Sequence, residues 1–424
     1  MDPLALRLLS DTASVGSDGR LSIGGVDVLE LAQEYGTPLF VYDEAHLRSR
    51  CREAVSVLGP DGVIYATKAF LCRAMARLVH DEGLRLDVAT GGELHVALSA
   101  GVPADRLVLH GNNKSDDELR TAMGAGVGRI VVDSHDELDR IEALVGFGSP
   151  RPTVLLRINP GIEVHTHEHV RTGNLDSKFG FPLPTGQAAE AVERARASAS
   201  VDLVGLHLHI GSQVFSVDNF LQGLGAVAPF VVDAALPELI VGGGLGVAYV
   251  AGEEAPTITE WASAIVEGCR AAGIRAEIAV EPGRAIAAAA AVTLYTVGTV
   301  KFIPGVRTYV AVDGGMSDNP RPVLYGSGYE TFLPRAASSR REMPIRLVGK
   351  HCESGDLLVR EGLVPADLAV GDVIATPVTG AYGHSMGSNY NKVLRPAVVF
   401  VAHGAARLVV RRETTDDLLA TDIG

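Results

Sequence analysis

The sequence predicts a (β/α)8 barrel joined to a second, mainly antiparallel β domain. From about Pro38 to Ala290, short apolar segments alternate with polar or glycine-rich turns and longer amphipathic stretches, which is typical of β/α units. After Ala290 the pattern changes to alternating segments rich in valine and threonine, which is typical of antiparallel strands. The predicted bounds are 38–290 for the barrel, and 1–37 with 291–424 for the β domain.

The candidate strands of the first domain suffice for a closed ring. Eight units within about 250 residues match the usual size of a barrel, so we favour it over an open doubly wound sheet. The candidate strands end at Lys68, Val88, His110, Asp133, Asn159, His209, Val241 and Glu281.

Composition excludes several classes of protein. The chain has 424 residues, 47% of them apolar, and a net charge of -14, which disfavours binding to nucleic acid. Its four cysteines are far apart, which argues against a structural zinc site and a disulfide framework, so no metal is expected. The start lacks a basic segment followed by an apolar run, and the apolar stretch 285–292 is too short to span a bilayer. We therefore expect a cytoplasmic protein without nucleic-acid or membrane partners.

A lysine ends the first candidate strand of the barrel. In the segment Val63–Lys68, alternation places Ile64, Ala66 and Lys68 on one face. The carboxyl ends of barrel strands carry the active site, and an inward lysine there is costly unless its pKa or covalent state changes. On this observation alone, a lysine that merely snorkels at a strand end is an equally good interpretation.

Two histidines lie on one face of the segment 201–213. His209 falls near the barrel mouth, before Gly211 and Ser212, where a hydroxyl and backbone N–H groups can meet an anion. For His207 we favour a satisfied core residue. The alternation places Leu203, Gly205, His207 and His209 on one face, and Val204, Leu206, Leu208 and Ile210 on the other.

The last two candidate strands lead into a glycine run and a charged turn. Gly242, Gly243 and Gly244 lack the signature of a nucleotide P-loop or a dinucleotide fingerprint, but they let the backbone approach a phosphate at the usual barrel site. The final strand runs into Glu281 to Arg284, which indicates a charged pocket, although an ordinary Glu–Arg pair explains it too. Lysine, histidine, glycine loop and strand-end glutamate together specify a pyridoxal-phosphate site.

With these motifs the chain resembles the fold-type III pyridoxal-phosphate-dependent decarboxylases, and in particular the diaminopimelate decarboxylases. The resemblance covers nearly the whole chain, and the Cys-Glu-Ser-Gly-Asp and Asp-Ser-Lys-Phe-Gly motifs are fairly specific to this branch. The matching stretches are 65–70, 110–114, 157–161, 165–167, 176–180, 209–212, 281–284, 317–322, 352–356, 380–383 and 388–391.

The resemblance implies a role for each matching residue. Lys68 is the Schiff-base lysine, His209 stacks on the cofactor ring, and Cys352 donates a proton, with Lys68 as the other candidate donor. Glu281 keeps the pyridine nitrogen protonated. The other implied contacts are Ser212, Gly243, Gly244, Gly283 and Arg284 for the cofactor, Arg284, Arg321 and Tyr325 for substrate carboxylates, Glu353 for the distal ammonium, and Tyr382 for both cofactor and substrate.

The resemblance also implies an activity and an assembly. The activity is decarboxylation of meso-2,6-diaminopimelate to L-lysine and CO2, the last step of lysine biosynthesis. The assembly is a homodimer in which Cys352 and Glu353 of one subunit complete the site built on Lys68 of the other. Two alternatives stay open: a decarboxylase for another basic amino acid or a racemase on the same fold, and a noncatalytic pyridoxal-phosphate carrier. The whole C-terminal domain argues against the carrier.

Overall fold

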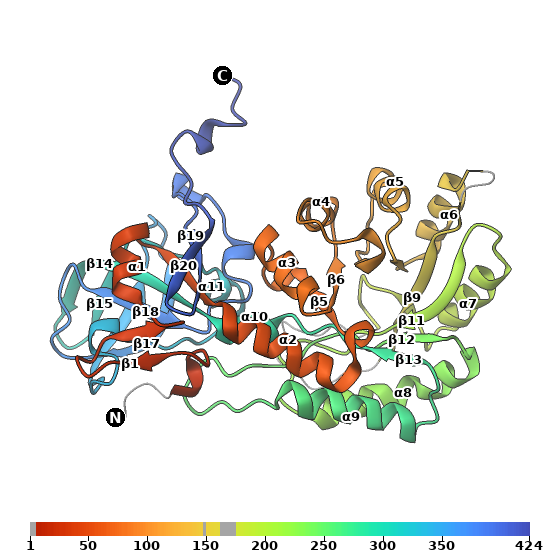
Figure 1. Ribbon diagram of the computed structural model, residues 1–424, viewed down its shortest axis with the longest axis horizontal. Helices are drawn as coiled ribbons and strands as arrows, with labels where there is room; N and C mark the ends of the chain where they lie inside the picture. Colours follow the sequence, from red (N-terminus) through yellow and green to blue (C-terminus); the bar gives the residue numbers. More distant parts are fainter. Residues whose placement is uncertain (1–5, 147–149, 162–174) are drawn as a thin grey trace. The chain divides into compact units, whose positions relative to one another are not determined.

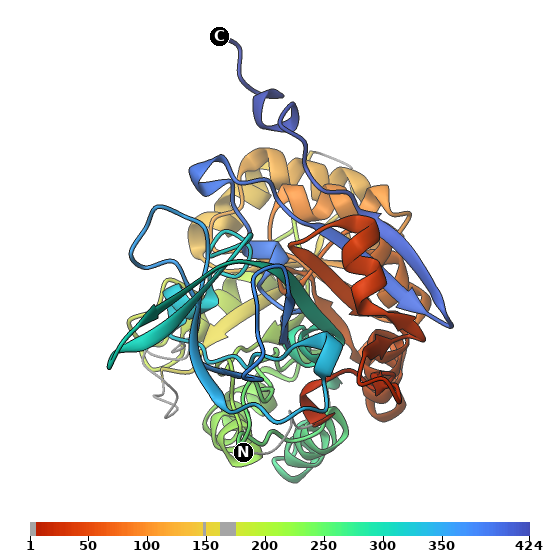
Figure 2. The same ribbon diagram turned by 90° about the vertical axis from the view of Figure 1, so that its left-hand side faces the viewer.

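The computed structural model describes residues 6–146, 150–161 and 175–424, and it divides into two compact units (Figures 1 and 2). One unit comprises Arg50–Gly246 and Ala255–Ala285. The other comprises Met1–Ser49, Val247–Glu254 and Ile286–Gly424. No helix in the described ranges combines the length and the apolar character needed to cross a membrane.

The first unit contains a ring of parallel strands, as the sequence predicts. The ring closes where Val63 bridges Val280: the N–H of Ile64 donates to the Val280 carbonyl at 2.9 Å, and the N–H of Val280 donates to the Gly62 carbonyl at 3.0 Å. This closure favours the barrel over the open sheet. In order around the ring the strands are β5 (Ile64–Ala66), β6 (Arg85–Val88), β7 (Leu107–Leu109), β8 (Arg129–Val132), β9 (Thr153–Asn159), β11 (Asp202–His207), β12 (Glu238–Ile240) and β13 (Glu277–Ala279).

Amphipathic helices follow most barrel strands and pack outside them (Figure 1). Their starts are well specified, because the side chains of Thr90, Ser115, Ser134 and Thr257 each accept a hydrogen bond from the N–H three residues later. The helices are α2 (Glu44–Leu58), α3 (Arg73–Asp81), α4 (Gly91–Ser99), α5 (Asp116–Ala125), α6 (His135–Leu144), α7 (Gln187–Ala197), α8 (Val217–Ala234) and α9 (Ile258–Ala271). The short strand β10 (Phe181–Pro182) pairs with the end of β9.

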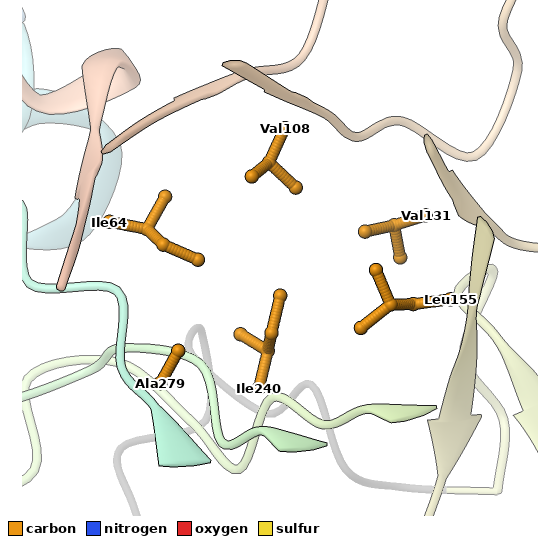
Figure 3. Close-up of a cluster of buried hydrophobic side chains, with 6 residues drawn as sticks. All are labelled: Ile64, Val108, Val131, Leu155, Ile240 and Ala279. Atoms are coloured by element: carbon orange, nitrogen blue, oxygen red, sulfur yellow. The ribbon is translucent and has the colours of Figure 1, made fainter. Parts of the chain in front are cut away.

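Aliphatic side chains fill the barrel, one from each of six strands (Figure 3). Ile64 is among them, which confirms the inward face expected for β5. Val204 also packs against this cluster, so its expected place on the outer face of β11 is wrong. The cause is a bulge between Leu203 and Gly205, which inserts one residue into the pairing with β9 and shifts the alternation. The cluster is Ile64, Val108, Val131, Leu155, Ile240 and Ala279.

The second unit is built on a mainly antiparallel sheet. Its order is β17-β16-β15-β14-β4-β19-β20, with β18 paired to β14, and the pairs β15–β16 and β4–β19 are parallel. The strands are β4 (Leu39–Asp43), β14 (Ala291–Ile303), β15 (Arg307–Val312), β16 (Met343–Val348), β17 (Leu357–Val364), β18 (Val373–Pro377), β19 (Ala397–Ala402) and β20 (Ala405–Val410).

The N-terminal part of this unit contains one strand that lies within the predicted barrel bounds. The strand β4 falls within the residues 38–290 assigned to the barrel, but its hydrogen bonds are to β14 and β19. A short, fully buried apolar run does not indicate which sheet it joins. The glycine-rich start forms a small sheet of its own, β1 (Ser14–Val15), β2 (Leu21–Ile23) and β3 (Val26–Asp27), before helix α1 (Val28–Tyr35).

A buried ion pair fastens the loop after β7 to the barrel wall. Lys114 is 2% exposed, and its Nζ donates to the carbonyls of Gly111 and Val131 and to Oε1 of Glu137, each at 2.7 Å. The second carboxylate oxygen of Glu137 accepts from the N–H of Asp133 at 3.0 Å. Burial lowers the pKa of Lys114 and raises that of Glu137, and their mutual attraction opposes both shifts. The pair therefore ties together the loop after β7, the end of β8 and the start of α6.

We expect Lys114→Met to destabilise the protein by about 3–5 kcal/mol, because it leaves the Glu137 carboxylate buried without its cation. The double variant Lys114→Met, Glu137→Leu should recover much of that loss. As a control, Arg120→Met removes an exposed ion pair with Asp117 and should cost under about 1 kcal/mol. Urea unfolding of the purified variants measures all three. Equal effects of Lys114→Met and Arg120→Met would contradict the account.

Candidate active site

Chemically active side chains gather at the carboxyl ends of the barrel strands. Lys68 lies in the 3-10 turn Thr67–Ala69 directly after β5, and Asp87 lies on β6. His110 follows β7, His207 ends β11, and Glu281 stands two residues past β13. Because the carboxyl ends of all parallel strands open at the same end of a barrel, residues from distant parts of the sequence meet there.

Glu281 is the centre of this group. Its side chain is 4% exposed; Oε2 lies 3.0 Å from Nε2 of His207, and Oε1 lies 2.9 Å from Nε2 of His110. Burial alone would raise the pKa of Glu281, but the two histidines hold it well below its ordinary value. The structure therefore places an ionised carboxylate inside the barrel mouth.

His207, at the end of β11, and His209, two residues after it, both have lowered pKa values. Burial brings the pKa of His207 to about 4 despite the attraction of Glu281, so its ring is neutral near pH 7. His209 keeps partial exposure, yet its enclosed surroundings and the positive charges of Lys68 and Arg157 lower its pKa as well. Both rings are therefore neutral near pH 7, and that of His207 contacts the charged Glu281 carboxylate.

Lys68 is less buried than an inward lysine would be. Its side chain is 51% exposed, and its Nζ lies 3.9 Å from Oδ2 of Asp87. Asp87 is buried, which raises its pKa, while the charges of His110 and Lys68 act in the opposite direction. The Thr67 hydroxyl donates to the Asp87 carbonyl at 2.6 Å. A primary amine is therefore held at the mouth beside an acid.

Arg157 on β9 brings a cation to the same end. Its guanidinium lies 4.3 Å from the centre of the Phe179 ring, and its Nε lies 3.9 Å from Oδ1 of Asp133. The other oxygen of Asp133 accepts from the N–H of Gly180 at 2.9 Å. These contacts fasten the Phe179–Gly180 segment to the ends of β8 and β9.

Glycines bring the loops after β11, β12 and β13 into backbone contact. A Cβ on Gly243 would lie 2.1 Å from the Glu281 carbonyl oxygen, and one on Gly244, at φ +107°, would lie 2.0 Å from that of Gly211. Larger residues do not fit at either position. Beside them Arg284 donates to the Ser212 hydroxyl at 3.1 Å. A guanidinium, a hydroxyl and close-packed backbone are the groups that suit a phosphate.

Gly283 packs against the end of β5, next to Lys68. A Cβ there would lie 2.8 Å from the Ala66 carbonyl oxygen. One unit of the structure therefore carries all the cofactor-binding residues predicted from the sequence except Tyr382: Lys68, His209, Ser212, Gly243, Gly244, Glu281, Gly283 and Arg284.

The remaining predicted residues lie in the other unit. Arg321 starts the short helix α11 (Arg321–Tyr325) and is buried; its guanidinium lies 4.1 Å from the centre of the Tyr249 ring and donates to the Tyr329 hydroxyl. Tyr325 ends that helix and is 48% exposed. The helix thus presents one anchored cation and one exposed phenol.

Cys352 and Glu353 are both exposed on a turn. The N–H of Cys352 donates to Oδ1 of Asn391 at 3.1 Å, and Oε1 of Glu353 accepts from the N–H of Gly355 at 3.2 Å. Tyr382 is half-buried at φ +60°, which is unusual for an aromatic residue and frequent at functional sites.

Sequence reasoning did not select His110, His207, Asp87 or Arg157 as site residues. The interpretation of His207 as a core residue holds for its burial, but its partner is the site carboxylate. The sequence did contain a signal for His110, because it is the last residue of a candidate strand. The matching stretch 165–167 lies outside the described residues.

Known proteins resemble the chain over nearly its full length. Residues 44–288 match the family described as pyridoxal-dependent decarboxylase, pyridoxal binding domain. Diaminopimelate decarboxylase of Mycobacterium tuberculosis is 48% identical, over 96% of this chain and 95% of its own length. That of Bacillus subtilis is 44% identical over 98% of both chains. A crystal structure of diaminopimelate decarboxylase from M. jannaschii in complex with L-lysine has a TM-score of 0.90 at 33% identity, covering 98% of both chains.

Proposed function

Since this chain belongs to the diaminopimelate decarboxylases within the pyridoxal-dependent decarboxylase family, we propose that it converts meso-2,6-diaminopimelate to L-lysine and CO2 with pyridoxal 5'-phosphate. The observation that carries the proposal is the buried, ionised Glu281 at the barrel end that also holds the Lys68 amine. This is the pair that the cofactor's chemistry needs. A cytoplasmic location suits such a biosynthetic enzyme, and in the described ranges no disulfide joins the four cysteines.

The residues present fit the cofactor. When bound, it supplies an electron sink for the carbon that loses the carboxylate. Buried Oε1 of Glu281 has no partner of hydrogen-bond geometry among the described residues, so it can accept from a protonated ring nitrogen. Lys68 would hold the cofactor through its amine, and His209 would stack on the ring. The phosphate would be held by Ser212, Gly243, Gly244, Gly283 and Arg284.

Charge matching supports the substrate. Diaminopimelate carries an ammonium and a carboxylate at both ends, so its recognition requires an acid as well as bases far from the reacting carbon. Arg284, Arg321 and Tyr325 would bind carboxylates, and Glu353 the distal ammonium. Tyr382 would contact both cofactor and substrate. The substrate of a diamine-forming decarboxylase has no distal carboxylate, so that enzyme needs no base to bind one.

A proton must replace the lost carboxylate on the same carbon. Cys352 and Lys68 are the candidate donors, since each carries a transferable proton on a reactive side chain. The ionised Glu281 would keep the proton on the ring nitrogen, while Cys352 or Lys68 would deliver a proton to the reacting carbon.

The direct test is CO2 release by the purified protein loaded with pyridoxal 5'-phosphate. We expect release from meso-diaminopimelate, with kcat/KM at least about a hundredfold above that for L-ornithine, L-arginine and L-lysine, because those substrates bring no distal carboxylate to the buried Arg321. Chromatography should identify L-lysine as the product. Preferred release from L-ornithine, or racemisation without CO2, would reject the assignment.

Substitution of Glu281 tests the electron sink. We expect Glu281→Gln to bind the cofactor but to lower kcat roughly a hundredfold or more, because a neutral amide cannot stabilise a protonated ring nitrogen. Steady-state kinetics and the visible absorbance of bound cofactor give the two readouts. Glu260→Gln, in the exposed capping box of α9, is the matched control and should keep wild-type kcat. Wild-type turnover in Glu281→Gln would show that another group sets the charge of the ring.

We further propose a homodimer with shared sites. The predicted cofactor residues on the barrel and the exposed Cys352 and Glu353 belong to different compact units, and an exposed catalytic cysteine needs a covering surface. A twofold interface supplies such a surface twice. Each dimer would then contain two composite sites.

Subunit exchange tests this arrangement. Lys68→Ala and Cys352→Ala should each be inactive alone, yet their mixture should recover roughly a quarter of wild-type activity, because half of randomly paired dimers carry one intact site. Mass spectrometry of isotope-labelled subunits would confirm the exchange. If exchange occurs and no activity returns, both residues belong to one chain's site and the shared-site proposal fails.

A further inference from the structure

His207 has a buried contact that the proposed chemistry does not use. Its side chain is 1% exposed, and its Nε2 lies 3.0 Å from Oε2 of Glu281 with hydrogen-bond geometry. The carboxylate is ionised and can only accept, so the proton of this bond belongs to Nε2 of His207. His207 is therefore the donor that satisfies one of the two Glu281 oxygens.

The surroundings of His207 allow a single tautomer. Its other nitrogen, Nδ1, is buried and lacks a hydrogen-bond partner within the part of the chain that the structure describes. A proton on Nδ1 would be a buried donor without an acceptor, which costs more than an unpaired lone pair. The pKa of about 4 keeps the ring neutral near pH 7, so Nδ1 carries no proton and Nε2 carries one.

The other oxygen of Glu281, Oε1, has no donor comparable to His207 among the described residues. Nε2 of His110 lies 2.9 Å from Oε1, but neither atom has a hydrogen-bond partner of proper geometry in the described ranges. The His110 ring instead packs edge-on against His207, with 4.8 Å between ring centres. Oε1 therefore keeps its acceptor capacity, whereas Oε2 is fixed. Asp87, Arg157 and His209 are other titratable groups that interact electrostatically with this carboxylate, and Lys68 acts on the neighbouring Asp87 and His209.

We propose that His207 is a positioning residue, whose Nε2–H fixes Oε2 and keeps Glu281 ionised with Oε1 presented to the ring nitrogen of the cofactor. The inference deepens the proposed function and rests on the role given there to Glu281. His110 supports the His207 ring from the side. Loss of the His207 donor leaves Oε2 buried without a hydrogen bond, and Glu281 then takes up a proton and cannot hold a pyridinium.

A matched pair of amides tests the proposal. His207→Gln carries an N–H at the reach of Nε2, whereas His207→Asn carries the same amide one methylene shorter. The readouts are the ¹⁵N chemical shift of ring-labelled pyridoxal 5'-phosphate in the holoenzyme and the Kd of the cofactor for the apoprotein. Samples are treated with EDTA, because His110, His207 and Glu281 offer donor atoms within 4.8 Å of one another.

Wild type and His207→Gln should both show a protonated ring nitrogen. His207→Asn should show a neutral one and bind the cofactor about tenfold more weakly or worse. A protonated ring nitrogen and wild-type Kd in His207→Asn would overturn the proposal. Glu281→Gln distinguishes failure of the role of Glu281 from failure of the role of His207. If the ring nitrogen stays protonated in Glu281→Gln as well, the proposed function of Glu281 fails. If it stays protonated in His207→Asn but not in Glu281→Gln, only the role of His207 fails.

A measurement on the wild-type protein keeps the proposal testable if one of the variants does not fold. The ¹⁵N spectrum of the imidazoles in the wild-type holoenzyme reports the tautomer of His207, assigned by its loss in His207→Gln or His207→Asn, or through its backbone connectivity. The proposal requires the Nε2–H tautomer at neutral pH. The Nδ1–H tautomer would overturn it, because Nε2 would then have no proton to donate.

Discussion

A charged carboxylate held inside an apolar barrel is the constraint on which the candidate site depends. An isolated buried carboxylate costs several kcal/mol and normally takes up a proton. Glu281 avoids this because His207 on β11 contacts Oε2 with hydrogen-bond geometry and His110, directly after β7, lies 2.9 Å from Oε1. Neither strand neighbours β13 in the sheet, so only a closed ring brings the three residues together. The closure between Val63 and Val280 is thus a requirement of the chemistry as well as of the fold.

Two sets of contacts fix the backbone around Glu281, one next to it and one farther away. Close by, the N–H of Glu281 donates to the Gly242 carbonyl at 2.8 Å, and Gly243 leaves no room for a side chain beside it. Farther out, the buried pair of Lys114 and Glu137 anchors the loop that begins at His110. The proposed phosphate site and the proposed ring-nitrogen site can therefore share one end of the barrel, because the backbone that joins them is closely packed.

Most of the architecture was predictable from the sequence, and the exceptions have local causes. The positions of Lys68 and Glu281 at the carboxyl ends of the barrel strands were predictable, because the apolar runs stop close to both residues and active sites form at that end of a barrel. Val204 was misplaced because a bulge cannot be read from alternation. β4 was grouped with the barrel because a short buried apolar run does not indicate that it pairs with β14 and β19. The contact between His207 and Glu281 was missed because it depends on which strands face each other across the ring, and that is a property of the closed structure.

The central claim is that Glu281 is ionised at neutral pH although it is buried. The most direct test is ¹³C NMR of the glutamate side-chain carboxyl groups in the apoprotein during a pH titration, with the Glu281 signal assigned by its loss in Glu281→Gln. The account predicts a carboxylate signal at pH 7 that persists as the pH falls below the range in which exposed glutamates take up protons, because the pKa of Glu281 is lowered. A protonated Glu281 at pH 7 would contradict it.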